Sequence, residues 1–437
     1  MRPVHRLTPL LRFWTGILAL LAVVVVNLNA SAAGTIASFL RGDGSFLPIL
    51  YGVGAFLAAC VAVWLGSYFW WRATGFELGE EELSLQRGVL QKQLRSARYD
   101  RIQAVDVVES IIARLFRVAA VRVETAGGKD SVIEIAYLNK RQAERLRAEL
   151  IHRAGGAAPE PEQEDADLTV PLHRALAGAG LRLGSIIGVA AIVILAISPL
   201  PTATALAAVV GILPGLWRQI DSSWRFTATF DQSRHVLNLS YGLADRRRQT
   251  IPLTRIHGAQ AVQPPLWRPL GWWQVTVTVA GYGPADSGDS GTSRILPVGT
   301  REQAVAVLAL VSELSPAEIE EHAAPEGHRD PDFTSPRRAW VVSPVDLNRQ
   351  SVTLHGDTVI CHTGRFGRSV AMIATSHIQE LTLRHGPLQQ LLHLCTVRFD
   401  LVNGPVRMGG HDLDVEDGAR LLDLLRGRRL PGYHQRV

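Results

Sequence analysis

Basic side chains gather in two short segments of this chain. The first spans fifteen positions in which Asp100 is the only acid, and its cations are Arg87, Lys92, Arg95, Arg98 and Arg101. The second follows Gly242 and consists of Arg246, Arg247 and Arg248. Such clusters attract anionic lipid headgroups, by about 1 kcal/mol per cation near a membrane surface. Alternating arginines are also typical of the solvated face of a strand, so both interpretations stay open.

Other patterns that could carry chemistry have plainer explanations. Residues 288–291 spell the Gly-Asp-Ser-Gly motif of serine proteases, but they lie in a Gly- and Ser-rich loop and no matching histidine segment occurs. Residues 412–418 match a calcium loop poorly, and helix capping explains them better. No phosphate-binding loop or dinucleotide motif is present. We therefore expect no catalytic residue and no cofactor.

Histidines and cysteines near the C-terminus do not form a metal-binding pattern. Their spacing lacks the two histidines one helical turn apart, with an acid, that a metal site uses. The histidines are His355, His362, His377, His385, His393 and His411. Cys361 and Cys395 occupy strand positions that are apolar in the other repeats, which predicts core packing. We expect no metal.

The composition indicates a membrane protein. Of 437 residues, 47% are hydrophobic and 19% are charged, against roughly 25% charged in soluble domains. No charge occurs in 13–40 or 45–71, and each stretch exceeds the roughly 20 residues that span a bilayer. We predict a hairpin over 13–71, with spans at about 13–36 and 47–71, entered and left on the cytoplasmic side because arginines flank both ends. A signal peptide cleaved near residue 32 is the alternative.

A second uncharged region covers residues 183–217. Pro199 and Pro201 interrupt it, and prolines this close break a continuous helix. We predict a second transmembrane hairpin over 173–219, whose first arm extends back to His173 while Arg182 snorkels. A shallow re-entrant pair is the alternative.

The rest of the chain repeats one pattern three times. Adding 154 or 276 to a position in the first copy leads, without a gap, to a similar residue in the second or third. The shared glycines are Gly88, Gly242 and Gly364, and the shared isoleucines are Ile102, Ile256 and Ile378. Beside these isoleucines, Arg101 and Gln103 match Arg255 and His257, then His377 and Gln379. The matches extend over about forty positions, which makes chance an inadequate explanation.

Each copy alternates with period two around its glycine and ends in a segment of helical period. The alternation predicts a hairpin of half-buried strands. The helices are expected at 141–152, 301–314 and 415–425, after the capping residues Asn139, Thr300 and Asp414. Strands followed by one amphipathic helix predict a small barrel or sandwich.

The segment from Gly88 to Gln103, together with 114–116 and 121–128, closely resembles the bacterial pleckstrin-homology-like (PH-like) module of YdbS/YdbT-type membrane proteins. The alternation of modules with hairpins resembles the longer, YdbT-like members. The resemblance implies that each repeat is a bent antiparallel barrel of about seven strands closed by a helix, in whose first hairpin anionic headgroups can dock. Arg117 stands where the family often has glycine, which Gly271 supplies in the second repeat, and His377 replaces the usual arginine in the third.

These observations predict the order of the parts. After the hairpin over 13–71 come module 1 (74–153), an acidic linker (154–170), the hairpin over 173–219, module 2 (225–314), a linker (315–338) and module 3 (339–430). We expect a multi-pass inner-membrane protein with both termini in the cytoplasm. It would be non-enzymatic, with modules that bind anionic lipid or a partner protein in envelope maintenance or membrane-stress protection.

Several partners and functions remain open. The resemblance names a shorter single-module PH-like membrane protein as one partner, and an oligomer is compatible with the sequence. The net charge of +5, without a basic tail, gives no sign of nucleic-acid binding. A membrane-bound enzyme acting on lipid or peptide and a purely structural scaffold are the alternatives.

Overall fold

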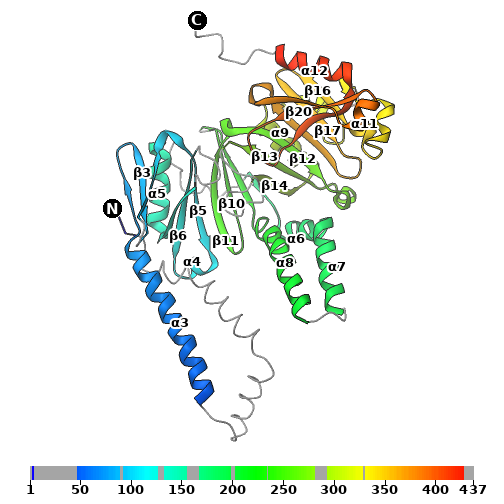
Figure 1. Ribbon diagram of the computed structural model, residues 1–437. Coiled ribbons are helices and arrows are strands. Elements are labelled where there is room, and N and C mark those ends of the chain that lie inside the picture. The colour runs from blue at the N-terminus through cyan, green and yellow to red at the C-terminus, as the bar shows by residue number, and fades with distance from the viewer. Residues whose placement is uncertain are drawn as a thin grey trace. The chain divides into compact units, whose positions relative to one another are not determined.

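The computed structural model describes residues 2–3, 47–88, 92–125, 132–154, 167–197, 202–233, 235–280, 293–327 and 330–427. The chain divides into two compact units, one of residues 1–126 with 131–159 and one of 127–130 with 160–437 (Figure 1). Each is described by itself. The first span predicted at 13–36 and the loop motif at 288–291 lie outside the described residues.

The first unit contains helix α3 (Leu47–Arg72) and module 1. All neighbouring strands of the module are antiparallel, in the orders β1-β2-β3-β4 and β5-β6-β7. The strands are β1 (Arg2–Pro3), β2 (Gly75–Leu78), β3 (Glu82–Arg87), β4 (Gln93–Arg98), β5 (Ile102–Ser110), β6 (Val118–Thr125) and β7 (Val132–Asn139). The helical elements are η1 (Tyr99–Arg101), α4 (Ile111–Leu115) and α5 (Lys140–Arg153).

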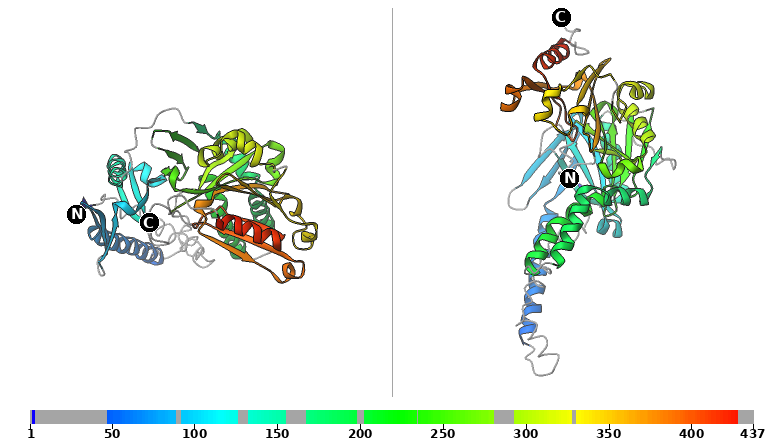
Figure 2. Two further views of the ribbon diagram at one scale, coloured as in Figure 1. Left: turned by 90° about the horizontal axis from the view of Figure 1, so that it is seen from above. Right: turned by 90° about the vertical axis from the view of Figure 1, so that its right-hand side faces the viewer.

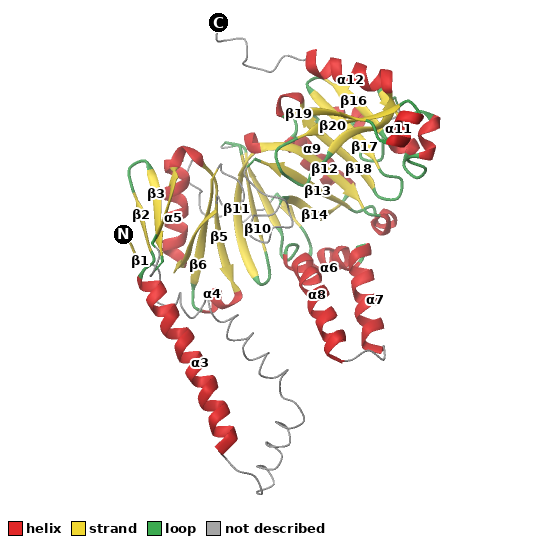
Figure 3. Ribbon diagram, viewed as in Figure 1, coloured by secondary structure: helices red, strands yellow, loops and turns green. Residues whose placement is uncertain are grey.

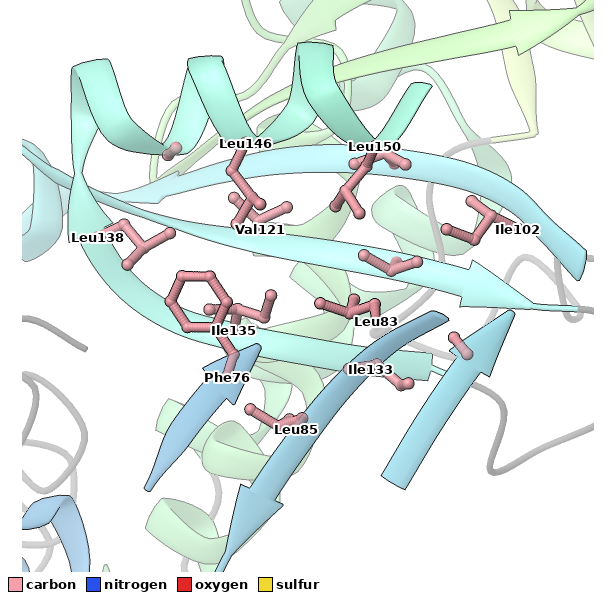
Figure 4. Packing of buried hydrophobic residues seen from close by; sticks show 14 of the residues in the cluster. Phe76, Leu83, Leu85, Ile102, Val121, Ile133, Ile135, Leu138, Leu146 and Leu150 are labelled. Atoms are coloured by element: carbon pink, nitrogen blue, oxygen red, sulfur yellow. The ribbon is translucent and has the colours of Figure 1, made fainter. Parts of the chain in front are cut away.

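The core of module 1 lies between the two sets of strands and beneath α5 (Figure 4). Leu83 and Leu85 of β3 are buried, as the alternation predicts, and Leu146 and Leu150 of α5 complete the cluster. The Asn139 side chain caps α5 by accepting a hydrogen bond from the N–H of Arg141 at 3.2 Å. This arrangement confirms the expected PH-like module.

Module 2, in the second unit, repeats the plan. Its strands are β8 (Leu168–Thr169), β9 (Thr227–Asp231), β10 (Val236–Tyr241), β11 (Asp245–Pro252), β12 (Ile256–Gln263), β13 (Trp273–Val279) and β14 (Arg294–Gly299). Its helical elements are α6 (Leu172–Gly180), α7 (Leu183–Ile197), α8 (Thr202–Asp221), η2 (Leu253–Arg255), η3 (Pro265–Leu270), α9 (Arg301–Val311) and α10 (Pro316–His322). Thr300 caps α9 in a capping box with Gln303.

Module 3 follows with seven strands and a C-terminal helix. Its strands are β15 (Phe333–Thr334), β16 (Ser351–His355), β17 (Thr358–Thr363), β18 (Arg368–Ala374), β19 (Glu380–Arg384), β20 (Leu394–Asp400) and β21 (Met408–Asp414). The helical elements are η4 (Arg337–Val341), η5 (Leu347–Arg349), η6 (Thr375–His377), α11 (Pro387–Leu391) and α12 (Val415–Gly427). The backbone N–H of Glu416 donates to the Asp414 side chain at 3.1 Å, which confirms capping of α12.

Modules 2 and 3 share one sheet. Strand β12 of module 2 pairs antiparallel with β18 of module 3, so seven strands run in the order β14-β13-β12-β18-β17-β16-β15 (Figure 3). The remaining strands of module 3 form a separate sheet in the order β19-β20-β21. The sequence repeat predicts separate modules, and the structure joins two of them through backbone hydrogen bonds.

The long helices are inserted between the first and second strands of a module. In module 2, β8 pairs directly with β9, although α6, α7 and α8 lie between them in the chain. In module 3, η4 and η5 occupy the corresponding place between β15 and β16. Each module therefore begins before its helices, so the ends of the predicted linkers 154–170 and 315–338 belong to modules.

The helical regions differ in part from the predicted hairpins. Among the described residues, no single helix has both the length and the apolar composition needed to span a bilayer, although α6 with residues 183–195 meets both criteria as a pair bent by 67°. The first arm therefore does not continue straight back to His173, because the chain bends between Gly180 and Leu183. Helices α7 and α8 run side by side (Figure 2).

The described parts of segment 315–338 are folded, which corrects its interpretation as a linker. It contains α10, whose Ile319 is fully buried. Arg301 at the start of α9 binds Glu320 at 2.5 Å and Glu326 at 2.7 Å, which holds this segment against module 2. The prediction failed because acidic residues and prolines are typical of an unstructured linker. Only the structure shows that Arg301, which is distant in the sequence, binds two of these acids.

The shared glycines lie at the turns that join β3 to β4, β10 to β11 and β17 to β18. Gly88, Gly242 and Gly364 have φ of 108°, 111° and 84°, a region that residues with side chains rarely adopt. A second left-handed position explains the family glycine, because Arg117, Gly271 and His393 have φ of 55°, 65° and 52°. The repeats thus share backbone geometry even where residue types differ.

Candidate membrane-docking surface

In module 1, the ends of β3 and β4 that are next to Gly88 and Lys92 lie at the end of the sheet where α3 stops. Gly75, three residues after Arg72, is paired with Gln86 at the end of β3. The end of β3 and the start of β4, with Gly88 and Lys92 next to them, therefore lie beside the end of the helix. We call this end of a module, where the inserted helices meet the strands, its helix-proximal end.

In module 2, a side chain at the end of α8 holds the corresponding turn at the helix-proximal end. Asp221, the last residue of α8, accepts hydrogen bonds from the backbone N–H groups of Leu243 and Ala244 at 2.9 and 2.5 Å. The N–H of Gly242 donates to the carbonyl of Trp224 at 3.0 Å. These bonds hold the β10–β11 turn, with the arginines that follow it, at the helix-proximal end.

The helices of module 2 pack on its strands through buried contacts. The indole N–H of Trp267, which is fully buried in η3, donates to the carbonyl of Gly178 in α6 at 3.1 Å. A Cβ on Gly178 would lie 2.5 Å from Val298 of β14, so only glycine permits this approach. The Arg182 guanidinium stacks over the Trp267 ring at 5.2 Å and binds Gln274, so Arg182 packs against the module.

Large apolar side chains are exposed at this same end. In module 1, the hydroxyl of Tyr99 in η1 donates to the carbonyl of Gly79, which lies at the end of the sheet opposite Gly75. Strand β5 starts from η1 and leads to α4 at its other end, where Leu115 of α4 is 78% exposed and the following Phe116 is 40% exposed. In module 2 the equivalent η3 exposes Leu266 and Leu270. Apolar side chains next to arginines match the layered composition of a membrane interface.

The structure separates the predicted cations of module 1. Lys92 lies at the hairpin turn, whereas Arg98 lies at the other end of β4, roughly 20 Å away at about 3.3 Å per residue. Arg98 forms an ion pair with Asp100 at 3.3 Å. Arg95 pairs with Leu85 in register, and the side chain of Arg87 is outside the described set.

The three arginines of module 2 also divide between two faces. Along β11, Gln249 and Ile251 are buried, and Arg247 shares their face because strand residues alternate. Arg246 and Arg248 therefore lie on the opposite face. Of the predicted set, Lys92, Arg246 and Arg248 are placed best for docking.

The remaining signature residues have structural roles. Ile102 and Ile256 are buried after the short helices η1 and η2, and their N–H groups donate back to Tyr99 and Leu253. Ile378 packs against the core of module 3. Arg101 and Arg255 end the same two short helices.

Both C-terminal cysteines and one of the histidines, His362, are buried, whereas His393 and His411 are exposed. No group of three metal-binding side chains occurs in the described part of the chain. Cys361 and Cys395 are buried in the core of module 3, where burial raises the thiol pKa values to about 12 and about 11. His377 stacks on His257 with ring centroids 4.3 Å apart, at the junction of β12 and β18. Burial lowers the pKa of both imidazoles.

Sequence reasoning missed Asp221 and the exposed leucines. Asp221 ends an apolar segment and carries no motif, so only the fold shows its contact with the turn. Apolar residues recur at the repeat positions of these leucines: Leu266 and Leu388 share one position, and Leu270 occupies another. Recurring apolar residues indicate a buried core, so the sequence did not identify these leucines as exposed. Their recurrence beside Arg114 and Arg268 was the available signal.

Comparisons with known proteins agree with this architecture. The model of the family described as Bacterial PH domain matches residues 17–154, 175–325 and 337–429. The chain is 25% identical over 97 residues to the UPF0699 transmembrane protein YdbT of Bacillus subtilis (strain 168). That alignment spans 22% of this chain and 20% of the relative.

Proposed function

Because this chain belongs to the bacterial PH domain family, we propose that it is a non-enzymatic, multi-pass membrane protein whose modules bind anionic lipid headgroups at their helix-proximal ends. Its two apolar regions would enter the inner membrane from the cytoplasm and return. The modules and both termini would lie in the cytoplasm, where the protein would serve envelope maintenance or membrane-stress protection.

The contact between Asp221 and the β10–β11 turn carries this proposal. If α7 and α8 enter the bilayer, the turn and its arginines are held at the level of the headgroups. The pairing of Gly75 with Gln86 gives module 1 the same geometry. The relative from Bacillus subtilis is named a transmembrane protein, which agrees with this placement.

Pairing of β1 with β2 supports entry and return on one side. Arg2 and Pro3 lie before the first apolar region, and they pair with Phe76 and Gly75 after it. A segment on each side of the region thus joins one sheet. This favours a hairpin over a cleaved signal peptide, because cleavage would remove β1.

Lipid binding would act by local concentration. The helices hold the modules near the leaflet, so even weak attraction of about 1 kcal/mol per cation changes occupancy. Exposed leucines such as Leu115 and Leu270 would add apolar contact at the interface. A shorter single-module PH-like membrane protein remains the partner that we propose for the same modules.

Native mass spectrometry of the detergent-solubilised full chain tests the lipid interaction. Phosphatidylglycerol and phosphatidylcholine are titrated into the wild type and into Arg246→Gln/Arg248→Gln. We expect a preference for phosphatidylglycerol that falls roughly 30-fold in the double variant, since it loses about 2 kcal/mol. The preference should also weaken with salt.

Arg426→Gln provides the control, because Arg426 is exposed on α12. It should bind as the wild type does. Equal affinity for the two lipids, or equal losses in the control and the double variant, would contradict the proposal.

A further inference from the structure

The junction between modules 2 and 3 is an edge-to-edge strand pairing. Ala259, Ala261 and Gln263 of β12 lie opposite Met372, Val370 and Arg368 of β18. Ala261 and Val370 are both fully buried. Strand β12 at the edge of module 2 thus pairs with β18, which is the last strand of the first sheet of module 3.

Each half of this junction has an equivalent elsewhere in the chain. The offset of 122 places β12 on β19, and the offset of 276 places β4 on β18. In the described part of the chain, β4 is the last strand beside β3, and β19 is the last strand beside β20. Among the described residues, β4 and β19 are therefore one edge of each kind to which no further strand is added.

The register of the junction brings two exposed leucines together. Transferred to β19 and β4, it sets Leu383 opposite Leu94, at the places of Ala261 and Val370. Leu383 is 39% exposed and Leu94 is 66% exposed. Exposed leucines on an edge strand are unusual, because edges commonly carry charges that block pairing.

The neighbouring pairs are compatible with this register. Arg384 lies opposite Gln93, Thr382 opposite Arg95, and Leu381 opposite Ser96. The fifth pair sets His385 opposite Lys92, just beyond the two strands, so no Arg or Lys faces another Arg or Lys directly.

We propose that β19 of one chain pairs antiparallel with β4 of a second copy, which repeats the module 2–module 3 junction between molecules. A second copy is the occupant because this chain carries both complementary edges. Such a head-to-tail contact is heterologous, so it produces rings or open chains. The proposal does not depend on lipid binding, and the two can fail separately.

Cysteine cross-linking of the full chain tests the register. Leu94→Cys protein is mixed with Leu383→Cys protein, both carrying Cys60→Ala, and treated with a short bifunctional maleimide. The buried Cys361 and Cys395 remain as in the wild type. We expect covalent dimers from this mixture and none from Leu115→Cys mixed with Leu383→Cys, although Leu115 is also exposed. Absence of the first product, or equal yields from both mixtures, would overturn the register.

Charge substitutions test the assembly itself. Mass photometry in detergent should show species larger than the 47.7 kDa chain, in multiples of it. Leu383→Lys should weaken association roughly tenfold, and Leu94→Glu/Leu383→Lys should recover most of the loss by pairing opposite charges. A wild type that stays a single chain, or assembly indifferent to Leu383→Lys, refutes the proposal. Binding of a single-module partner at β19 without self-association also refutes it.

Discussion

The turn at Gly242 permits a sharp comparison with a second glycine in the same module. Gly242 has φ of 111°, and a Cβ there would lie 2.0 Å from the carbonyl oxygen of Asp245. Gly271 also has a positive φ, of 65°, but a Cβ there meets no atom within 4 Å. Replacement of Gly271 by alanine therefore adds only left-handed strain, whereas replacement of Gly242 adds strain and a backbone collision.

These differences translate into different free energies of unfolding. Gly271→Ala should cost about 1 kcal/mol, the strain of a left-handed residue. Gly242→Ala should cost about 3 kcal/mol, because φ lies beyond the left-handed region and the turn must move. At roughly tenfold per 1.4 kcal/mol, local opening should accelerate about fivefold in the first variant and over 100-fold in the second.

Hydrogen exchange with mass spectrometry measures this difference. The full chain has several modules, so a single unfolding midpoint is not defined, and exchange of the β10 and β13 amides is the proper readout. The unaffected strands of module 1 serve as the internal reference. Equal acceleration by Gly242→Ala and Gly271→Ala would refute the reasoning, because it would show that the collision is relieved without cost.

Three further outcomes follow from contacts described above. Arg301→Ala should free α10 and speed exchange there by several-fold, since the ion-pair network is worth about 1 kcal/mol at its exposure, and Arg301→Lys should recover only part because it cannot bridge both acids. The pKa values of His257 and His377 are lowered in the folded chain, so the unfolded chain binds more protons as the pH falls. Protection of the β12 and β18 amides should therefore hold above about pH 6.5 and fall below it. His257→Gln should flatten this pH profile. Asp221→Ala should lower phosphatidylglycerol preference without altering protection of the β13 amides, since it releases only the β10–β11 turn.

Much of each module could be predicted because its signals are local. Alternating apolar residues mark the strands of the first hairpin, and a glycine marks each turn. Asn139 and Asp414 cap helices that begin where the periodicity changes. Such features depend on neighbours in the chain, so they are visible without a structure.

Two features could not be predicted from the sequence: the sheet that modules 2 and 3 share, and the short first strands that precede the inserted helical segments. Strands β8 and β15 have two residues each, too few for any periodicity. Pairing of β12 with β18 uses backbone groups that every residue has, so no side-chain pattern encodes it. Docking of α10 depends on Arg301, which lies before it in a different helix.

The inserted helices suggest that the strands determine the fold of a module and that different segments can be accommodated between its first and second strands. Antiparallel helices return the chain to its starting point, which allows β8 to pair with β9, and module 3 closes the same pair with η4 and η5 instead. A Cβ on Gly188 would lie 3.2 Å from Ile212, so a four-residue Gly-Ser loop in place of 189–211 can join α7 to α8. Since α6 still covers Trp267, exchange protection of β9–β14 should stay within about twofold of the wild type. Loss of that protection would show that the full helices stabilise the module, and the strands alone would no longer explain its fold.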